Sequence, residues 1–229
     1  MGKPDPHKAL ASREPAFARL IAAYGPQDPF VWHDGGRTGT SLFAALLLHI
    51  TGQRISALAG FTLFDRIAAA TDGIPTPAAV EGLGVPRLRS MGLTDTKAHC
   101  AIALASAQTH GTLDLDALAD MDDRAVIDTL TSVRGIGRWT AQAFLMRQLH
   151  RPDVLPAEDM GLRQAIQDQW HLGHLPTVGE VLTRATAWSP YRSYASALLW
   201  RSLKPVGELS DPKERALHRF GGPDDPRHS

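Results

Sequence analysis

Apolar residues recur along most of the chain at the three- and four-residue spacing of amphipathic helices. The segments with this spacing are separated by glycines and by residues that favour helix N-termini, such as the Thr76-Pro77 pair. No segment shows sustained two-residue alternation, although Phe30-Val31-Trp32 fits a short extended piece. The pattern predicts an all-α protein. Helix starts are expected at Thr40 or Ser41, Thr76, Thr94 or Asp95, Asp122, Asp159, Thr177 and Ser189-Pro190.

Composition narrows the class of protein. Hydrophobic residues make up 43% of the 229 residues, as in ordinary globular domains, and the longest apolar run, residues 42–48, is too short to span a bilayer. The first residues lack the apolar stretch of a secretory signal. Cys100 is the only cysteine, which excludes an intramolecular disulfide and a cysteine-ligated iron–sulfur cluster or zinc site. We therefore expect a cytoplasmic protein with no membrane partner.

The charge is balanced overall but unevenly distributed. Formal net charge is zero, which argues against binding nucleic acid through a basic tail. Residues 111–130 hold six Asp and one Arg, whereas residues 131–204 hold nine basic and five acidic residues. On charge alone, an ordinary solvated surface is favoured over a nucleic-acid-binding face as the explanation of this excess.

Residues 130–137 join two predicted helices through a turn with glycine at positions 135 and 137. Glycine permits positive φ and lets the backbone approach an oxygen atom closely. The first N–H groups of the following helix, near Gly137 to Thr140, carry the positive end of its dipole and favour a bound phosphate. A plain helix connection is the alternative. The residues expected to contact a phosphate backbone are Arg134, Gly135, Gly137, Arg138 and Thr140.

Three segments together resemble one known family. Residues 133–141, Val-Arg-Gly-Ile-Gly-Arg-Trp-Thr-Ala, resemble the helix-hairpin-helix of base-excision DNA glycosylases, most closely the alkylated-base (3-methyladenine) branch. Residues 51–56 resemble the family's Gly-Gln-x-x-Ser loop, and residues 190–195 its Pro-Trp-Arg-Ser-Tyr-Ala segment. The resemblance extends from about residue 14 to residue 204.

The resemblance implies two helical subdomains with the helix-hairpin-helix motif and an active-site cleft between them. We expect a core of residues 13–204 between a disordered N-terminus, residues 1–12, and a tail, residues 205–229, because both ends are rich in Pro, Gly and charge. The central subdomain would cover about residues 41–155, including the hairpin at 130–141. Residues 13–40 and 156–204 would form the second subdomain.

Asp159 is the expected catalytic residue, because it follows Trp139 by 20 residues, the spacing of the family's catalytic Asp. An Asp before a helical pattern is also a common N-cap, and the two roles are compatible because the helix N-terminus favours the anion. An ionised carboxylate beside the sugar can stabilise oxocarbenium-like charge and can orient or deprotonate water. The neighbouring Glu158 is expected to face solvent.

Trp139 occupies the position where bifunctional members of the superfamily carry a Schiff-base lysine. The resemblance therefore implies a monofunctional enzyme that uses water and needs no catalytic cofactor. The family also binds one monovalent cation, Na⁺ or K⁺, through backbone carbonyls that correspond here to Thr131, Val133 and Gly135.

The resemblance places Trp139 and Tyr191 in the base pocket, with Tyr191 in place of the usual Trp. Aromatic rings suit alkylated purines because such bases are cationic. Trp188, Tyr194 and Trp200 recur near helical spacing and are interpreted as core residues. Extruding a nucleotide leaves a gap in the duplex, which Gln53 or Arg54 would fill; the sequence leaves open which of the two does so.

These residues predict a monomeric DNA glycosylase that removes alkylated bases such as 3-methyladenine and 7-methylguanine from double-stranded DNA. Two other interpretations fit less of the pattern. One is a non-catalytic protein that recognises distorted DNA through the hairpin, and the other is an unrelated all-α protein.

Overall fold

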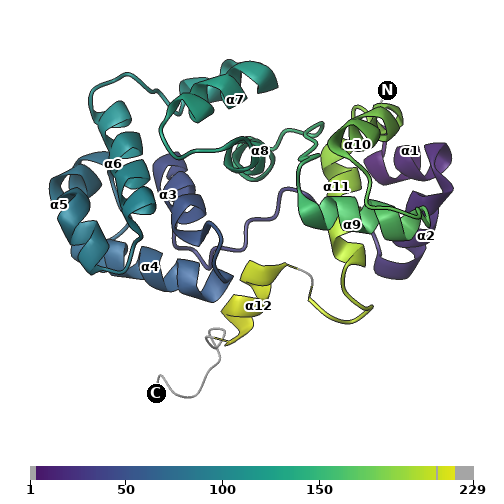
Figure 1. Ribbon diagram of the computed structural model, residues 1–229, viewed down its shortest axis with the longest axis horizontal. Helices are drawn as coiled ribbons and strands as arrows, with labels where there is room; N and C mark the ends of the chain where they lie inside the picture. Colours follow the sequence, from purple (N-terminus) through teal and green to yellow (C-terminus); the bar gives the residue numbers. More distant parts are fainter. Residues whose placement is uncertain (1–3, 210, 220–229) are drawn as a thin grey trace. The chain divides into compact units, whose positions relative to one another are not determined.

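The computed structural model describes residues 4–209 and 211–219, and within them it contains α-helices, two short 3-10 helices and no strand. The expected all-α fold is confirmed (Figure 1). The segment 30–32 is not extended into a strand. The helices are α1 (Pro6–Arg13), α2 (Pro15–Tyr24), α3 (Leu42–Gly52), α4 (Ala57–Ala70), α5 (Pro77–Ser90), α6 (Asp95–Thr109), η1 (Ala117–Asp120), α7 (Asp123–Ser132), α8 (Arg138–Arg147), α9 (Met160–Gln169), α10 (Val178–Arg184), η2 (Ala185–Trp188), α11 (Arg192–Ser202) and α12 (Pro212–Arg219).

Polar N-caps set most helix starts. Side chains predicted to begin helices accept a hydrogen bond from the first turn of α3, α5, α6, α7, α9 and α10. Thr177 and Glu180 form a complete capping box, which satisfies two of the unpaired N–H groups of α10. α11 differs from the prediction, since it begins at Arg192 after Tyr191 and not at Ser189-Pro190.

Both ends of the chain carry a helix where the composition suggested disorder. The Asp5 carboxylate accepts hydrogen bonds from the N–H groups of His7 and Lys8 at the start of α1, and Leu10 is fully buried. In the tail, α12 packs against α4 and buries Ala216. Burial of these apolar side chains explains the order of residues rich in Pro and charge. Residues 1–3, 210 and 220–229 lie outside the described part of the chain.

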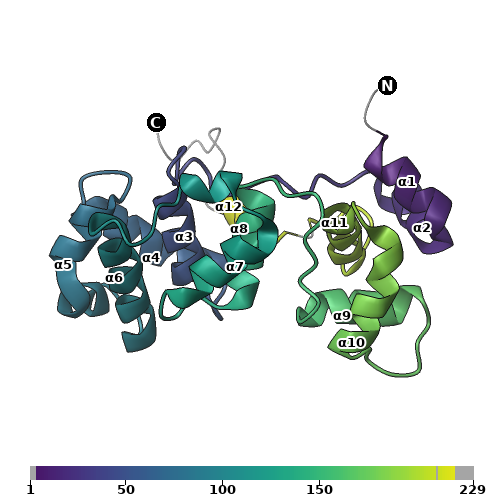
Figure 2. The ribbon, with the colours of Figure 1, turned by 90° about the horizontal axis from the view of Figure 1, so that it is seen from above.

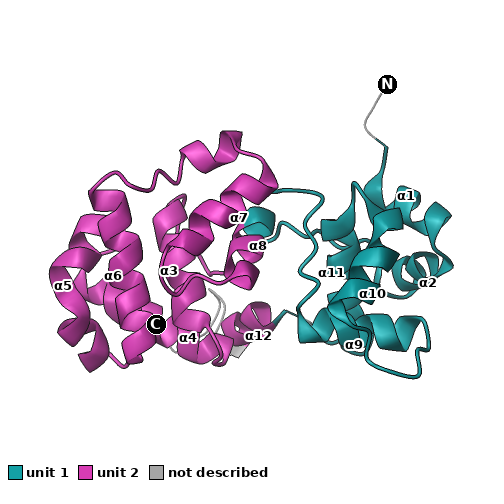
Figure 3. Cartoon of the chain, turned by 45° about the horizontal axis from the view of Figure 1, so that its top comes forward, with its two compact units in different colours: residues 1–32, 145–211 teal, residues 33–144, 212–229 magenta. Residues whose placement is uncertain are grey.

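The chain divides into two compact units (Figure 3). Unit 1 comprises residues 1–32 and 145–211, and unit 2 comprises residues 33–144 and 212–229. The subdomain limits inferred from the resemblance remain a prediction. No helix within the described residues is both long enough and apolar enough to cross a membrane.

The core of unit 2 forms around α3. Every residue of α3 from Phe43 to Thr51 is buried, and the helix packs against α4 and α6. α5 lies beside α6 (Figure 2), with a break in its helical conformation at Gly84 (φ 66°, ψ 167°). A helix that is apolar on all sides must be enclosed by other elements. α4 and α6 therefore pack around α3 and cover it.

The core of unit 1 joins α1, α2, α9 and α11. Phe17 and Trp188 are fully buried and meet edge to face, with ring centroids 5.2 Å apart. α11 packs against α2 and α9. Because α9 packs against α11, the N-terminus of α9, where Asp159 lies, is held beside α11.

Candidate functional site

The turn between α7 and α8 alternates buried and exposed residues. Val133 and Ile136 are buried, and the Ile136 N–H donates to the Val133 carbonyl at 3.0 Å. Arg134, Gly135 and Arg138 are exposed. The two apolar side chains therefore anchor the turn, while its glycine backbone and both arginines remain accessible.

Gly135 could not be replaced without disturbance. Its φ is +95°, and an added Cβ would lie 2.7 Å from the Cys100 Cβ and 2.8 Å from its Sγ. Cys100 is buried on α6 directly behind the turn, and burial raises the pKa of its thiol to about 11. The turn thus rests on α6, and the cysteine supports it as a small apolar side chain.

The loop after α3 is attached to the same turn. The Gln53 side-chain amide donates to the Gly135 carbonyl and to the Thr140 hydroxyl, both at 3.3 Å. The Thr140 side chain is buried, so any contribution of this residue to phosphate binding falls to its main chain. Arg54 is exposed and has a φ of +55°, a conformation that costs a non-glycine residue energy.

Lys97 binds the segment that leads into this loop, a role that the sequence did not predict. Its ammonium group donates to the Thr51 carbonyl at 2.8 Å, at the C-terminal end of α3. Only 7% of the residue is exposed, and burial lowers the pKa of its amine. Lys97 and Cys100 lie three residues apart, on one face of α6. The three-residue spacing predicts that the two side chains share a face of α6. The sequence does not show that this face is buried by other parts of the chain.

In unit 1, Asp159 caps α9 as expected. Its Oδ1 atom accepts hydrogen bonds from the Leu162 N–H at 2.8 Å and from the Trp200 indole N–H at 2.9 Å. Glu158 is exposed, in agreement with the expectation. Trp200, which its spacing predicts to be a core residue, is partly buried against the core of unit 1. Its contact with an acid 41 residues away has no local signal.

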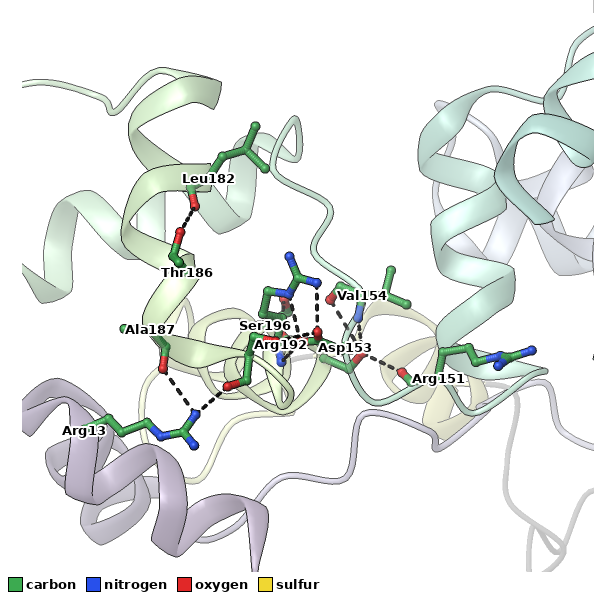
Figure 4. A network of polar contacts seen from close by, with 11 residues as sticks. Arg13, Arg151, Asp153, Val154, Leu182, Thr186, Ala187, Arg192 and Ser196 are labelled. Atoms are coloured by element: carbon green, nitrogen blue, oxygen red, sulfur yellow. Dashed lines mark hydrogen bonds and ion pairs between the residues drawn. The ribbon is translucent and has the colours of Figure 1, made fainter. Parts of the chain in front are cut away.

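A polar network connects the segment before Asp159 to the start of α11 (Figure 4). The Asp153 carboxylate accepts two hydrogen bonds from the Arg192 guanidinium, each 2.8 Å long, and one from the Ser189 hydroxyl at 2.8 Å. The Ser193 hydroxyl accepts from the Val154 N–H at 3.0 Å. Burial raises the pKa of Asp153, but the hydrogen bonds from Arg192 and Ser189 together lower it below its usual value.

The aromatic residues divide between the units. Tyr191 is partly buried in unit 1, where its ring meets Tyr194 edge to face. Trp188 is a core residue, as interpreted from the sequence, and Tyr194 is partly buried against the same core. Trp139 belongs to unit 2, and 46% of it is exposed. The structure therefore joins Gln53 to the hairpin in unit 2 and Trp200 to Asp159 in unit 1, and Tyr191 also belongs to unit 1.

The described residues contain no group of three or more His, Cys, Asp or Glu side chains that could hold a metal ion. A monovalent cation would instead need the carbonyls of Thr131, Val133 and Gly135. The Val133 and Gly135 carbonyls each accept one hydrogen bond, from Ile136 and Gln53. A carbonyl oxygen has two lone pairs, so each of these two oxygens can still contact such an ion.

No family model matches the chain, but individual proteins do. YfjP of Bacillus subtilis, which carries a provisional DNA-3-methyladenine glycosylase name, is 33% identical over 171 residues. The alignment covers 72% of this chain and 60% of YfjP, so the chain spans less than two thirds of that relative.

Two solved structures are similar along most of their length. The 3-methyladenine DNA glycosylase Mag1 of Schizosaccharomyces pombe, solved with abasic DNA, has a TM-score of 0.76 at 23% identity, covering 89% of this chain and 98% of Mag1. A DNA-3-methyladenine glycosidase of Bacillus halodurans has a TM-score of 0.75 at 25% identity, covering 94% and 97%. Together with the sequence similarity to YfjP, these structures identify the chain as a member of the helix-hairpin-helix DNA glycosylase superfamily, in its 3-methyladenine glycosylase branch.

Proposed function

We propose that this protein is a monofunctional DNA glycosylase of base excision repair. It removes alkylated bases of the 3-methyladenine and 7-methylguanine type from double-stranded DNA and leaves an abasic site. The observation that carries the proposal is Asp159, which caps α9 and accepts two hydrogen bonds on one carboxylate oxygen. It follows the hairpin at the spacing of the family's catalytic Asp.

Asp159 acts on the sugar and not on the base. Departure of the base leaves positive charge on the deoxyribose, and a fixed anion stabilises that charge best when it does not have to reorient. The Leu162 N–H at the start of α9 and the indole of Trp200 restrict the carboxylate in this way. The same group orients or deprotonates the attacking water.

The base needs little help to leave. Alkylation at a ring nitrogen makes a purine cationic, so the enzyme need not protonate it. Trp139 and Tyr191 are the aromatic residues that we assign to base recognition, and cation–π attraction contributes roughly 0.5–2 kcal/mol. Selectivity then follows from how much more easily a damaged base leaves than a normal one.

DNA is held through the hairpin. The main chain of Gly135 and Gly137 and the exposed side chains of Arg134 and Arg138 bind the phosphate backbone. A Na⁺ or K⁺ ion on the Thr131, Val133 and Gly135 carbonyls would add positive charge next to that phosphate. The Mag1 structure with abasic DNA supports DNA as the partner.

Arg54, and not Gln53, fills the gap left by the extruded nucleotide. The Gln53 amide is bonded to the hairpin, whereas the Arg54 side chain is exposed on a strained backbone at the tip of the loop. Strained backbone is often retained at functional positions. Gln53 accordingly fixes the loop, and Arg54 enters the duplex.

The test of the function is release of free base from duplexes that each carry one defined lesion. Asp159→Asn should retain binding to abasic DNA while nearly abolishing release of 3-methyladenine and 7-methylguanine. Release at the wild-type rate would remove Asp159 from the mechanism. Binding without release by the wild-type protein would instead indicate a non-catalytic DNA-binding protein.

The monofunctional mechanism has a separate test. Borohydride reduces and traps a Schiff base between an enzyme amine and the sugar. We expect no covalent adduct with abasic DNA, because Trp139 cannot form one. A trapped adduct accompanied by strand nicking would show lyase activity and contradict the proposal.

A further inference from the structure

The segment that carries Arg54 begins where α3 ends. The last carbonyls of a helix have no partner within the helix, and a buried carbonyl left unpaired costs free energy. If α3 continued for another turn, the Thr51 carbonyl would accept from the Ile55 N–H. That N–H instead donates to the Gly52 carbonyl, at 3.4 Å. Thr51 is fully buried, so its carbonyl needs a donor from another part of the fold.

Lys97 supplies that donor from α6. Its ammonium group lies 2.8 Å from the Thr51 carbonyl oxygen, and a cation at the C-terminal end of a helix also interacts favourably with the helix dipole. Burying the amine has a cost, because burial disfavours its charged form and lowers its pKa. An apolar side chain of similar length, such as Met, would avoid that cost. The bond to Thr51 is therefore what an amine contributes at this position.

α4 holds the end of α3 from another side. α3 packs against both α4 and α6 (Figure 1). At Gly60 of α4, an added Cβ would lie 2.9 Å from the Gly52 Cα and 3.4 Å from the Gly52 N. Both contacts are to the backbone, so no rotation of a side chain can relieve them. Gly60 has no positive φ, so the close approach of the two backbones is the reason for glycine at this position.

Arg54 is the residue that these contacts hold in place. Its φ of +55° costs energy, and such a conformation persists only where the surrounding structure imposes it. Lys97 and Gly60 act on the two residues before Gln53, and the Gln53 amide is bonded to the hairpin. The exposed Arg54 side chain therefore projects from a backbone that is fixed on its N-terminal side.

We infer that Lys97 is a positioning residue for Arg54: together with Gly60, it holds the end of α3 so that Arg54 is presented to DNA in the conformation that fills the gap in the duplex. The inference rests on the proposed function, in which Arg54 is the wedge. Lys97 itself needs no contact with DNA. Without its bond the loop would adopt other conformations, and the apparent affinity for DNA falls in proportion to the fraction of molecules that can bind.

The experiment measures the affinity for duplex DNA with one abasic site, and the thermal stability of the protein, in matched variants. Lys97→Met removes the amine, and Lys97→Arg retains a charged donor. Arg66→Met is the control, because Arg66 of α4 donates to the Met91 carbonyl at the end of α5, also at 2.8 Å and in the same unit. Gly60→Ala displaces the loop without altering the amine. Its control is Gly82→Ala, where a Cβ would meet nothing within 4 Å.

We expect Lys97→Met to weaken binding about tenfold, as when roughly one molecule in ten keeps the competent loop, and Lys97→Arg to restore most of the affinity. Gly60→Ala should weaken binding in the same direction. Arg66→Met and Gly82→Ala should stay within about twofold of wild type, because their sites are independent of the loop. In the Arg54→Gly background, Lys97→Met should have little further effect, because residues that act as a unit are non-additive.

Four outcomes would overturn the inference. Wild-type affinity in Lys97→Met would do so and leave the proposed function standing, because base release and the Asp159→Asn test do not involve Lys97. Equal losses of affinity in Lys97→Met and Arg66→Met would show that lowered stability, and not the position of the loop, weakens binding. If Lys97→Met folds too poorly to assay, wild-type affinity in Gly60→Ala decides against the inference. If Arg54→Gly binds as tightly as wild type, the wedge assignment fails and the positioning role fails with it.

Discussion

Replacing Arg192 with alanine should destabilise unit 1 by about 2–4 kcal/mol. The change removes two hydrogen bonds of 2.8 Å from the Asp153 carboxylate, and bonds to charged groups contribute roughly 1.5–3 kcal/mol each. The Arg192 and Asp153 side chains are 33% and 23% exposed, so water replaces part of the loss. The pair still contributes more to stability than a surface salt bridge does, because removing the guanidinium leaves a largely buried anion behind.

Urea unfolding followed by tryptophan fluorescence is the suitable assay. Four of the five tryptophans, residues 32, 170, 188 and 200, belong to unit 1, so the signal reports mainly on that unit. Arg124→Ala is the control, because Arg124 and Asp128 form an ion pair that is 91% and 69% exposed. We expect the control to change the free energy of unfolding by less than about 0.5 kcal/mol.

The pH dependence has a definite sign. The pKa of Asp153 is lower in the folded protein than in the unfolded chain, so its contribution to stability is full above the unfolded pKa of about 4. That contribution is lost as the pH falls through the lower, folded pKa. The difference between wild type and Arg192→Ala should therefore be largest near neutral pH and shrink in acid. Equal destabilisation by Arg192→Ala and Arg124→Ala at neutral pH would refute the reasoning.

Three further predictions concern unit 2. Gly135→Ala should lower the stability of this unit by about 2–3 kcal/mol, because the added Cβ meets Cys100. Gly137→Ala, where a Cβ meets no described atom within 4 Å, should keep nearly the wild-type stability, and thermal unfolding of both variants checks this. Arg54→Gly should relieve a φ of +55° and stabilise the fold by up to about 1 kcal/mol while lowering the affinity for DNA; an unchanged affinity would exclude Arg54 as the wedge. Cys100, with its pKa raised to about 11, should react with iodoacetamide at pH 8 at least about a hundredfold more slowly in the native protein than in urea, and equal rates would contradict its burial.

Local patterns predicted the helices well and the ends of the chain poorly. An N-cap such as Asp122 or Thr177 acts on the residues that immediately follow it, so its effect can be read from a short stretch of sequence. The helices α1 and α12 depend instead on Leu10 and Ala216 being covered by residues far along the chain. The composition of a chain end does not show which distant residues will pack against it, so it did not predict these two helices.

The all-α class, the Gly135 turn and an acid at a helix start can be predicted from short stretches of sequence, because each depends on interactions within a few residues. Three contacts depend instead on the packing of distant helices: Trp200 donates to Asp159, Gln53 is bonded to the hairpin, and Lys97 is buried beneath Thr51. These contacts join residues 41, 82 and 46 positions apart. Their partners are selected by how the helices pack, and helix packing depends on the shapes of many side chains at once, which no short segment contains.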